Sequence, residues 1–270
     1  RSQVVKCHGE ISEKLYVNVG VPQGSVLGPI LFIVFINDIS QHVHTGTTNL
    51  FADDTLVYCT GDDLLETNVK LQQCVNEISN WYRKNNIVVN EEKCCSMLIG
   101  PRRKMNDDGL DVSINNCSIK NVKSMNYLGL EIDDALTWNN YVNRLCKSLY
   151  FKISKFARLS KTVSKDILIK IYNSTIQPSI DYVLSVWGCT NLTNINKVQR
   201  LQNYCARIVE NNFDYIQVRG LNLVKQLGWM NVKERYNYFQ TLLTFKCIHG
   251  LAPHYLMNNI LMEIEIKEKR

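Results

Sequence analysis

The chain has 270 residues, of which 45% are hydrophobic and 21% are charged. This composition excludes a disordered tail, a collagen-like rod and a low-complexity linker. Its longest uninterrupted apolar run, residues 30–36, is far shorter than the roughly 20 residues that a membrane-spanning helix needs. The first residues also lack the apolar stretch of a secretory signal. We therefore expect an intracellular protein, in the nucleus or cytoplasm, with no membrane partner.

Charge is distributed unevenly along the chain. Residues 1–100 contain 7 Lys and Arg against 11 Asp and Glu, whereas residues 101–200 contain 15 against 8. Between positions 144 and 170, eight basic residues accompany one acid, Asp166. A polyanion such as nucleic acid is a natural partner for this segment, although a solvated helix face has the same pattern.

The first half of the chain predicts short strands and two helices. Residues 16–21 read as a strand that enters a turn, and residues 26–39, almost all apolar, predict a buried helix with Pro29 in its first turn. Residues 49–52 and 55–59 are short β-prone segments, which predict a tight hairpin. Apolar residues at steps of three and four predict an amphipathic helix over residues 62–85.

The second half changes from strands to helices. From Trp138 onward the pattern is helical, with breaks near residues 160–162, Pro178 and residues 188–193 and 250–253. The predicted fold class is therefore α+β, with a boundary near residue 136. Before that boundary, four further strands are predicted at residues 87–89, 96–99, 112–114 and 125–132.

Two adjacent aspartates, Asp53 and Asp54, lie at the tip of the predicted hairpin between apolar flanks. Like charges about 4 Å apart repel by roughly 4 kcal/mol at an effective dielectric constant of 20. A divalent cation would relieve this repulsion, and Mg²⁺ usually binds through one or two carboxylates together with substrate phosphates. The pair therefore indicates phosphoryl or nucleotidyl transfer. Two other aspartate pairs are interpreted as a helix start (62–63) and a surface loop (133–134).

Several motifs together resemble the reverse transcriptase of non-LTR retrotransposons, especially the jockey-like group. They are GVPQGSVLGP at 20–29, IND at 36–38, LFADD at 50–54, Asn90 with Lys93, YLG at 127–129, Pro178, Tyr182, WG at 187–188 and LQ at 201–202. The resemblance covers nearly the whole chain. It implies part of a right-hand polymerase, with a palm over residues 1–136 and a mainly helical, basic thumb and C-terminal extension over residues 137–270.

The resemblance also implies RNA-directed DNA synthesis from an RNA template, a DNA primer and deoxynucleoside triphosphates. Asp53 and Asp54 would hold two Mg²⁺ ions, with Mn²⁺ as an alternative, and Lys93 would give a proton to the departing pyrophosphate. Nucleotide or template contacts are expected at Pro22, Gln23, Gly24, Ser25, Phe51 and Ala52. The primer end is expected at Tyr127, Leu128 and Gly129, and the nucleic-acid backbone at Arg144, Lys147, Lys152, Lys155 and Arg158.

Two further readings remain open. Reverse transcriptases of this kind use a third aspartate, on a strand upstream of the Gln23–Gly24 turn, and the sequence begins after that strand. We therefore expect this chain alone to be inactive. We also expect it to be poorly soluble, because the missing strand leaves an open sheet edge. One alternative to a polymerase fragment is a nucleic-acid-binding remnant that keeps the basic helical half without catalysis. A phosphatase or nuclease using the same carboxylates is disfavoured because it does not predict the thumb-like helices.

Overall fold

The computed structural model describes residues 2–16, 20–21, 24–100 and 109–257. The chain forms two compact units, one of residues 1–98 with 102–122 and the other of residues 99–101 with 123–270. We call them the strand-rich unit and the helical unit. Both units mix helices and strands, which agrees with an α+β fold. The division falls before the boundary expected near residue 136, and the assignment of residues 1–136 to a palm stays a prediction.

The centre of the strand-rich unit is an antiparallel hairpin of β5 (Thr47–Phe51) and β6 (Asp54–Tyr58), as the sequence predicts. Helix α2 (Leu64–Lys84) packs beside it, and a core cluster of Ile36, Ile39 and Trp81 contacts Leu50 and Val57 of the hairpin. Asp63 caps α2 by accepting a hydrogen bond from the Glu66 backbone N–H at 2.8 Å. This confirms the predicted helix and its aspartate start.

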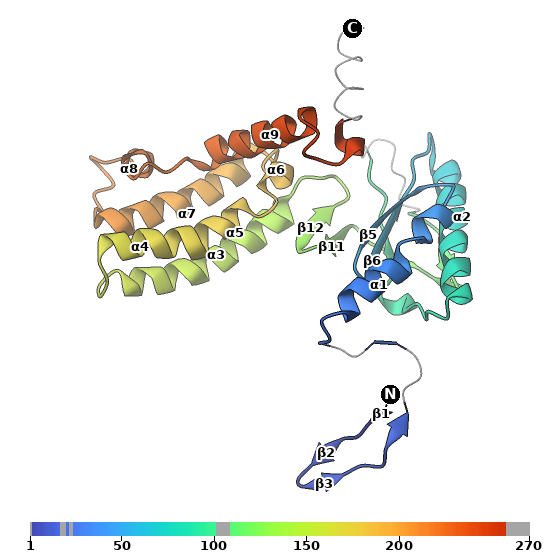
Figure 1. Ribbon diagram of the computed structural model, residues 1–270. Helices are drawn as coiled ribbons and strands as arrows, with labels where there is room; N and C mark the ends of the chain where they lie inside the picture. The colour runs from blue at the N-terminus through green and yellow to red at the C-terminus, as the bar shows by residue number, and fades with distance from the viewer. Residues whose placement is uncertain (1, 17–19, 22–23, 101–108, 258–270) are drawn as a thin grey trace. The chain divides into compact units, whose positions relative to one another are not determined.

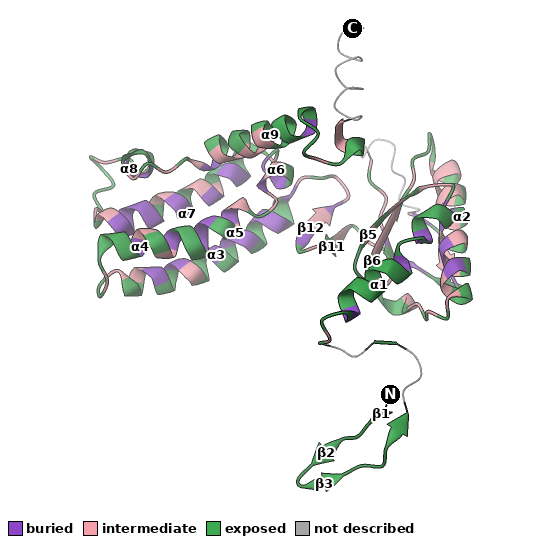
Figure 2. Cartoon of the chain, viewed as in Figure 1, coloured by how far each residue is buried: buried purple, intermediate pink, exposed green. Residues whose placement is uncertain are grey.

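Helix α1 (Gly28–Ile36) forms where the apolar run predicts a helix, but it is not buried. Only Gly28 and Ile36 are buried, whereas Ile30, Ile33 and Val34 are 56–70% exposed. Figure 2 shows most of α1 in green, the colour of exposed residues. The prediction of a buried helix was wrong because one face packs on the hairpin and α2, while no other described element of this unit covers the opposite face.

The remaining strands of this unit are pairs of two residues each. Antiparallel pairs join β1 to β4, β2 to β3 and β8 to β9, and a parallel pair joins β7 to β10. No strand forms at residues 87–89, where one was predicted. The bounds are Ser2–Gln3 (β1), Lys6–Cys7 (β2), Glu10–Ile11 (β3), Leu15–Tyr16 (β4), Cys95–Ser96 (β7), Ser113–Ile114 (β8), Cys117–Ser118 (β9) and Lys120–Asn121 (β10). Two 3-10 turns span Ile39–His42 and Glu91–Lys93.

The helical unit begins with the β11–β12 hairpin (Ser124–Tyr127 and Leu130–Asp133), so the single strand predicted over residues 125–132 is in fact two. Helices α3, α4 and α7 pack together in Figure 1, with Leu149 of α3, Leu168 of α4 and Val198 of α7 among their buried residues. The helices are α3 (Asn139–Leu159), α4 (Lys165–Ile171), α5 (Gln177–Asp181), α6 (Leu184–Trp187), α7 (Leu192–Glu210), α8 (Gly220–Gln226) and α9 (Val232–Ile248). Among the described helices, none is both long and apolar enough to cross a membrane.

A π-helical turn, Tyr172–Ile176, joins α4 to α5, so the helix continues where a break near Pro178 was predicted. Proline has no backbone N–H and therefore cannot donate to the carbonyl of Ser174, four residues earlier. The widened turn accommodates this missing hydrogen bond. Such turns are frequent at functional sites, and this one lines a groove described below.

The aspartate pair at 133–134 is not the surface loop that the sequence suggested. Asp133 is 9% exposed, and its carboxylate accepts hydrogen bonds from the backbone N–H groups of Thr137 at 2.9 Å and Trp138 at 2.8 Å. These bonds fix the connection from β12 to α3. The carboxylate is buried because the loop folds around it.

Candidate active site

The β5–β6 turn carries the two predicted metal ligands. Phe51 pairs with Asp54 in the register, so Ala52 and Asp53 form the two-residue turn and Asp54 is the first residue of β6. Both aspartates are exposed, and their carboxylates make no hydrogen bond or ion pair within the described parts of the chain. They are therefore free to bind a cation.

This exposure changes the electrostatic argument made from the sequence. The apolar flanks pack at Leu50 and Val57, but the tip of the hairpin remains in solvent. In water, two charges about 4 Å apart repel by about 1 kcal/mol, not the roughly 4 kcal/mol of a partly buried pair. Repulsion between the two carboxylates therefore does not by itself require a cation. The stronger indication of a cation site is that both carboxylates are unpaired within the described chain and lie at a turn of fixed conformation.

The backbone of this turn is strained, and a hydrogen bond to α2 supports the adjacent strand residue. Ala52 has a φ of +51°, a left-handed conformation that costs a non-glycine residue roughly 1–2 kcal/mol. Beside it, the Thr55 hydroxyl and the Tyr82 hydroxyl of α2 share a hydrogen bond of 2.8 Å. Such strain persists when surrounding contacts determine the conformation, and it is common at functional sites.

The other residues predicted for this site are only partly located. Pro22 and Gln23 lie outside the described residues, while Gly24 has a φ of +77° and the Ser25 hydroxyl accepts a hydrogen bond from the Gly28 N–H at the start of α1. Lys93 ends a 3-10 turn and is exposed. Within the described part of the chain, its ammonium group makes no hydrogen bond or ion pair to the hairpin.

The predicted primer-binding residues form the tight turn of the β11–β12 hairpin. Tyr127 pairs with Leu130, and the two turn residues between them, Leu128 and Gly129, have φ values of +49° and +78°. The Tyr182 hydroxyl donates a hydrogen bond to the Leu128 carbonyl, and the Tyr182 ring lies where a side chain on Gly129 would contact it.

Arg144 of α3 also holds this turn. Its guanidinium donates to the Asn126 side chain at 2.6 Å and to the Gly129 carbonyl at 3.0 Å, and Glu131 lies 3.5 Å away. Sequence reasoning assigned Arg144 to nucleic-acid backbone and gave Tyr182 no role. The contacts join residues 15 to 54 positions apart, so periodicity and local spacing carry no signal of them.

The other predicted backbone contacts lie along α3. Lys147, Lys155 and Arg158 are exposed and form a stripe at steps of three to eight residues, as the helical period requires. Lys152 is half-buried, and its ammonium group donates to the Ser179 hydroxyl at 2.5 Å and to the Thr175 carbonyl at 3.4 Å. No carboxylate pairs with these four lysine and arginine side chains in the residues that the structure describes.

The donor set at the β5–β6 turn fits a hard divalent cation to a limited extent. Carboxylate oxygens are the ligands that Mg²⁺ prefers, and two carboxylates can suffice when phosphate oxygens complete the coordination. Over residues 2–16, 20–21, 24–100 and 109–257, however, no group of three or more His, Cys, Asp or Glu side chains could hold a metal by itself. The turn therefore supplies two carboxylates, and the other ligands must come from elsewhere.

Comparisons with known proteins now identify the chain's relatives. Residues 2–132 match the family described as reverse transcriptase (RNA-dependent DNA polymerase). The chain is similar to the RNA-directed DNA polymerase from mobile element jockey of Drosophila melanogaster, with 28% identity over 82% of this chain and 25% of the relative. It is also similar to the probable RNA-directed DNA polymerase from transposon X-element of the same species, with 29% identity over 77% of this chain and 24% of the relative.

A third relative is the retrovirus-related Pol polyprotein from type-1 retrotransposable element R1 of Nasonia vitripennis, with 24% identity over 93% of this chain and 75% of the relative. The chain spans about a quarter of the length of the jockey and X-element relatives. No solved structure matches it. The region that matches the reverse transcriptase family contains the strained turn with both aspartates, and the similarity to the jockey polymerase covers 82% of the chain and so extends beyond that region.

Proposed function

We propose that this chain is part of an RNA-directed DNA polymerase of a non-LTR retrotransposon, with Asp53 and Asp54 as its metal-binding carboxylates. The observation that carries the proposal is the pair of free carboxylates at the Ala52–Asp53 turn, inside the region that matches the reverse transcriptase family. Divalent cations held by these carboxylates would favour loss of the proton from the primer's 3′-hydroxyl and would neutralise charge on the triphosphate.

The proposed reaction extends a DNA primer by one nucleotide on an RNA template. The primer's 3′-hydroxyl loses its proton to solvent water, its oxygen forms a bond to the α-phosphorus of a deoxynucleoside triphosphate, and the bond from that phosphorus to the bridging oxygen of the leaving pyrophosphate breaks. Lys93 supplies a proton to the pyrophosphate that leaves. Gly24, Ser25, Phe51 and Ala52, with Pro22 and Gln23, contact template and nucleotide.

We further propose that the helical unit binds the template–primer duplex. The turn at Tyr127, Leu128 and Gly129 receives the primer end, and Arg144 supports that turn while contacting nearby backbone. Lys147, Lys152, Lys155 and Arg158 of α3 contact phosphates. Such contacts supply affinity without sequence choice and weaken as the salt concentration rises.

The test uses the double variant Asp53→Asn/Asp54→Asn and the control Asp111→Asn, which removes one exposed carboxylate elsewhere in the same unit. Electron paramagnetic resonance follows Mn²⁺ binding in the presence of a deoxynucleoside triphosphate, fluorescence anisotropy follows template–primer binding, and extension is assayed in parallel.

We expect the double variant to lose Mn²⁺–nucleotide binding while retaining template–primer binding, and the control to retain both. Equal Mn²⁺–nucleotide binding by the double variant and the unmodified chain would overturn the metal assignment. Template–primer binding without any Mn²⁺–nucleotide binding by the unmodified chain would instead support the non-catalytic, nucleic-acid-binding alternative.

A further inference from the structure

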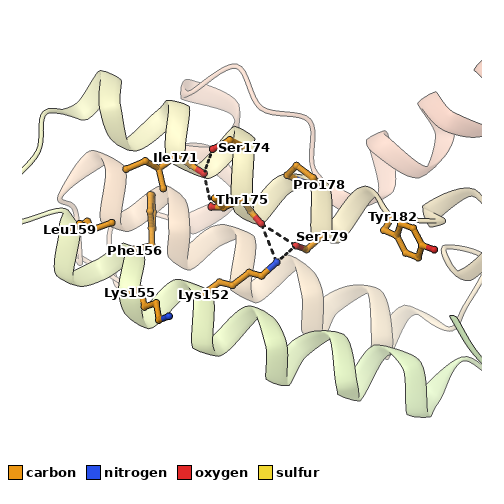
Figure 3. A pocket seen from close by; sticks show the side chains of 10 residues that line it. All are labelled: Lys152, Lys155, Phe156, Leu159, Ile171, Ser174, Thr175, Pro178, Ser179 and Tyr182. Atoms are coloured by element: carbon orange, nitrogen blue, oxygen red, sulfur yellow. Dashed lines mark hydrogen bonds between the residues drawn. The ribbon is translucent and has the colours of Figure 1, made fainter. Parts of the chain in front are cut away.

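An open groove of about 740 Å³ lies between α3 and the π-helical turn of the helical unit (Figure 3). Its volume is within the roughly 300–1,000 Å³ typical of ligand sites. Phe156 and Leu159 of α3 form one side, and Ile171 and Pro178 form the other. The groove therefore offers an apolar surface that the duplex contacts proposed above do not use.

The hydroxyl groups of the groove are already engaged with the protein. Ser174 and Thr175 each donate to the carbonyl of Ile171, at 3.2 and 2.7 Å, and Ser179 donates to the Thr175 carbonyl at 3.0 Å. The π-helical turn thus presents its apolar side chains and keeps its hydroxyls bonded along the helix. A ligand in the groove would therefore bind mainly through apolar contacts and not through hydrogen bonds to these three hydroxyl groups.

A fixed positive charge lies in the wall of this apolar groove. Lys152 extends across the groove to Ser179 and Thr175, as Figure 3 shows, and both of its partners are neutral oxygens. Lys155 lines the same groove and is exposed. Because no carboxylate in the described chain neutralises either lysine, the groove attracts a ligand that is both anionic and partly apolar.

One exposed aromatic ring lines the groove, and a second lies beside one of its lysines. Tyr182, at one end of the groove, is 48% exposed, and its hydroxyl is anchored to the Leu128 carbonyl, so the ring is held in place. Phe151 of α3 does not line the groove, but it is 64% exposed and the ammonium nitrogen of the groove residue Lys155 lies 4.3 Å from the centre of its ring. Exposed rings between cations are the pattern with which proteins bind unpaired nucleic acid, since bases stack on rings and phosphates meet charges.

We infer that this groove binds an unpaired stretch of a polynucleotide strand, with bases against its apolar surface and phosphates at Lys152 and Lys155. A duplex keeps its base faces stacked inside and presents mainly phosphates, whereas a single strand exposes both base faces and phosphates. The inference rests on the proposed nucleic-acid function of the helical unit and refines it, because Lys152 and Lys155 then contact the phosphates of an unpaired stretch, whereas Lys147 and Arg158 remain for the duplex. An acidic amphipathic peptide is the competing occupant, and the rings favour the strand.

The test fills the groove without changing charge. Ser174→Trp places bulk inside it, and the matched control Asn173→Trp places the same bulk on the neighbouring exposed residue, which does not line the groove. Fluorescence anisotropy measures the affinity of the full chain for an unpaired RNA oligonucleotide and for an RNA–DNA duplex of equal length. Circular dichroism melting checks that each variant folds.

We expect Ser174→Trp to weaken unpaired RNA binding about tenfold, the effect of losing one stacked base, and to leave duplex binding unchanged. Asn173→Trp should change neither affinity. Lys152→Gln, a second variant that leaves the groove open, should reduce the salt dependence of unpaired RNA binding by about one phosphate contact.

Unchanged affinity for unpaired RNA in both Ser174→Trp and Lys152→Gln would overturn the inference while the proposed function survives. An equal loss of duplex binding in Ser174→Trp would also overturn it, because the groove would then hold duplex backbone. Binding of neither RNA nor duplex by the unmodified chain would refute the nucleic-acid role of the helical unit itself. Binding of an acidic amphipathic peptide that Ser174→Trp abolishes, with RNA unaffected, would reassign the groove to a protein partner.

Discussion

Removing the charge of Asp133 should destabilise the helical unit. Its carboxylate is 9% exposed and accepts three backbone hydrogen bonds, from Thr137, Trp138 and Ala135. In Asp133→Asn the amide oxygen can replace only one carboxylate oxygen, and the amide N–H₂ then faces a backbone donor. Losing a hydrogen bond to a charged group costs about 1.5–3 kcal/mol, so we expect a loss of about 2 kcal/mol in the free energy of unfolding.

The same carboxylate predicts a pH dependence. Burial by itself raises the pKa of Asp133, but the N–H groups of Thr137 and Trp138, the Thr137 hydroxyl and the Ala135 N–H together hold the pKa below its ordinary value. A lowered pKa in the folded state contributes stability that is present above the unfolded-state pKa of about 3.9 and is lost as the pH falls through the folded-state pKa. Asn does not titrate, so the difference between the two proteins should be constant near neutral pH and should shrink in acid.

Urea unfolding, followed by circular dichroism at a series of pH values, measures both effects. Asp134→Asn is the matched control, because the neighbouring carboxylate makes no hydrogen bond or ion pair within the described residues. The control should stay within about 0.5 kcal/mol of the unmodified chain. A stability loss in Asp133→Asn that is no larger than this, or that does not change between neutral pH and acid, would refute the reasoning.

Three further changes test other parts of the structure. Val34→Glu, on the exposed face of α1, should raise soluble yield with little change in melting temperature, as measured by centrifugation and calorimetry. Ala52→Gly should stabilise the strand-rich unit by about 0.5 kcal/mol in urea unfolding, because the relief of left-handed strain exceeds the added chain entropy. Tyr182→Phe should speed amide exchange in the β11–β12 turn, since the bond to Leu128 is lost; unchanged exchange would contradict that support.

The sequence predicts elements well where local pattern controls them. The spacing of apolar residues predicts α2 within two residues at its start and one at its end, and the β-prone segments around Asp53 predict the β5–β6 hairpin. In both cases the pattern of residues within one short segment determines which secondary structure forms. The helical pattern from Trp138 onward likewise corresponds to α3, in which Tyr141, Leu149 and Phe156 recur at helical spacing and are buried.

Features that depend on distant segments were missed. The apolar composition of α1 predicts a buried helix, but burial requires that other elements cover the helix on all sides. The described elements of the strand-rich unit cover only one side of α1. The residues around Asp133 have the composition of a surface loop. The loop nevertheless turns back, so that the backbone N–H groups of three following residues donate to the Asp133 carboxylate. The apolar residues that flank Asp53 and Asp54 suggest that the two carboxylates are buried. They are exposed because the turn lies at the tip of the hairpin.

The two hairpins assigned to catalysis and primer binding share one feature that links strain to function. Each places a non-glycine residue, Ala52 or Leu128, at a positive φ within its turn. At the second turn the support is explicit, because Tyr182 bonds to the Leu128 carbonyl and Arg144 bonds to the Gly129 carbonyl. A turn held in a costly conformation by outside contacts keeps its shape when a ligand binds, so the ligand does not have to order it. We therefore expect Arg144 to contribute to primer binding through the shape of the turn, so that its replacement weakens template–primer binding in fluorescence anisotropy even where phosphate contacts remain.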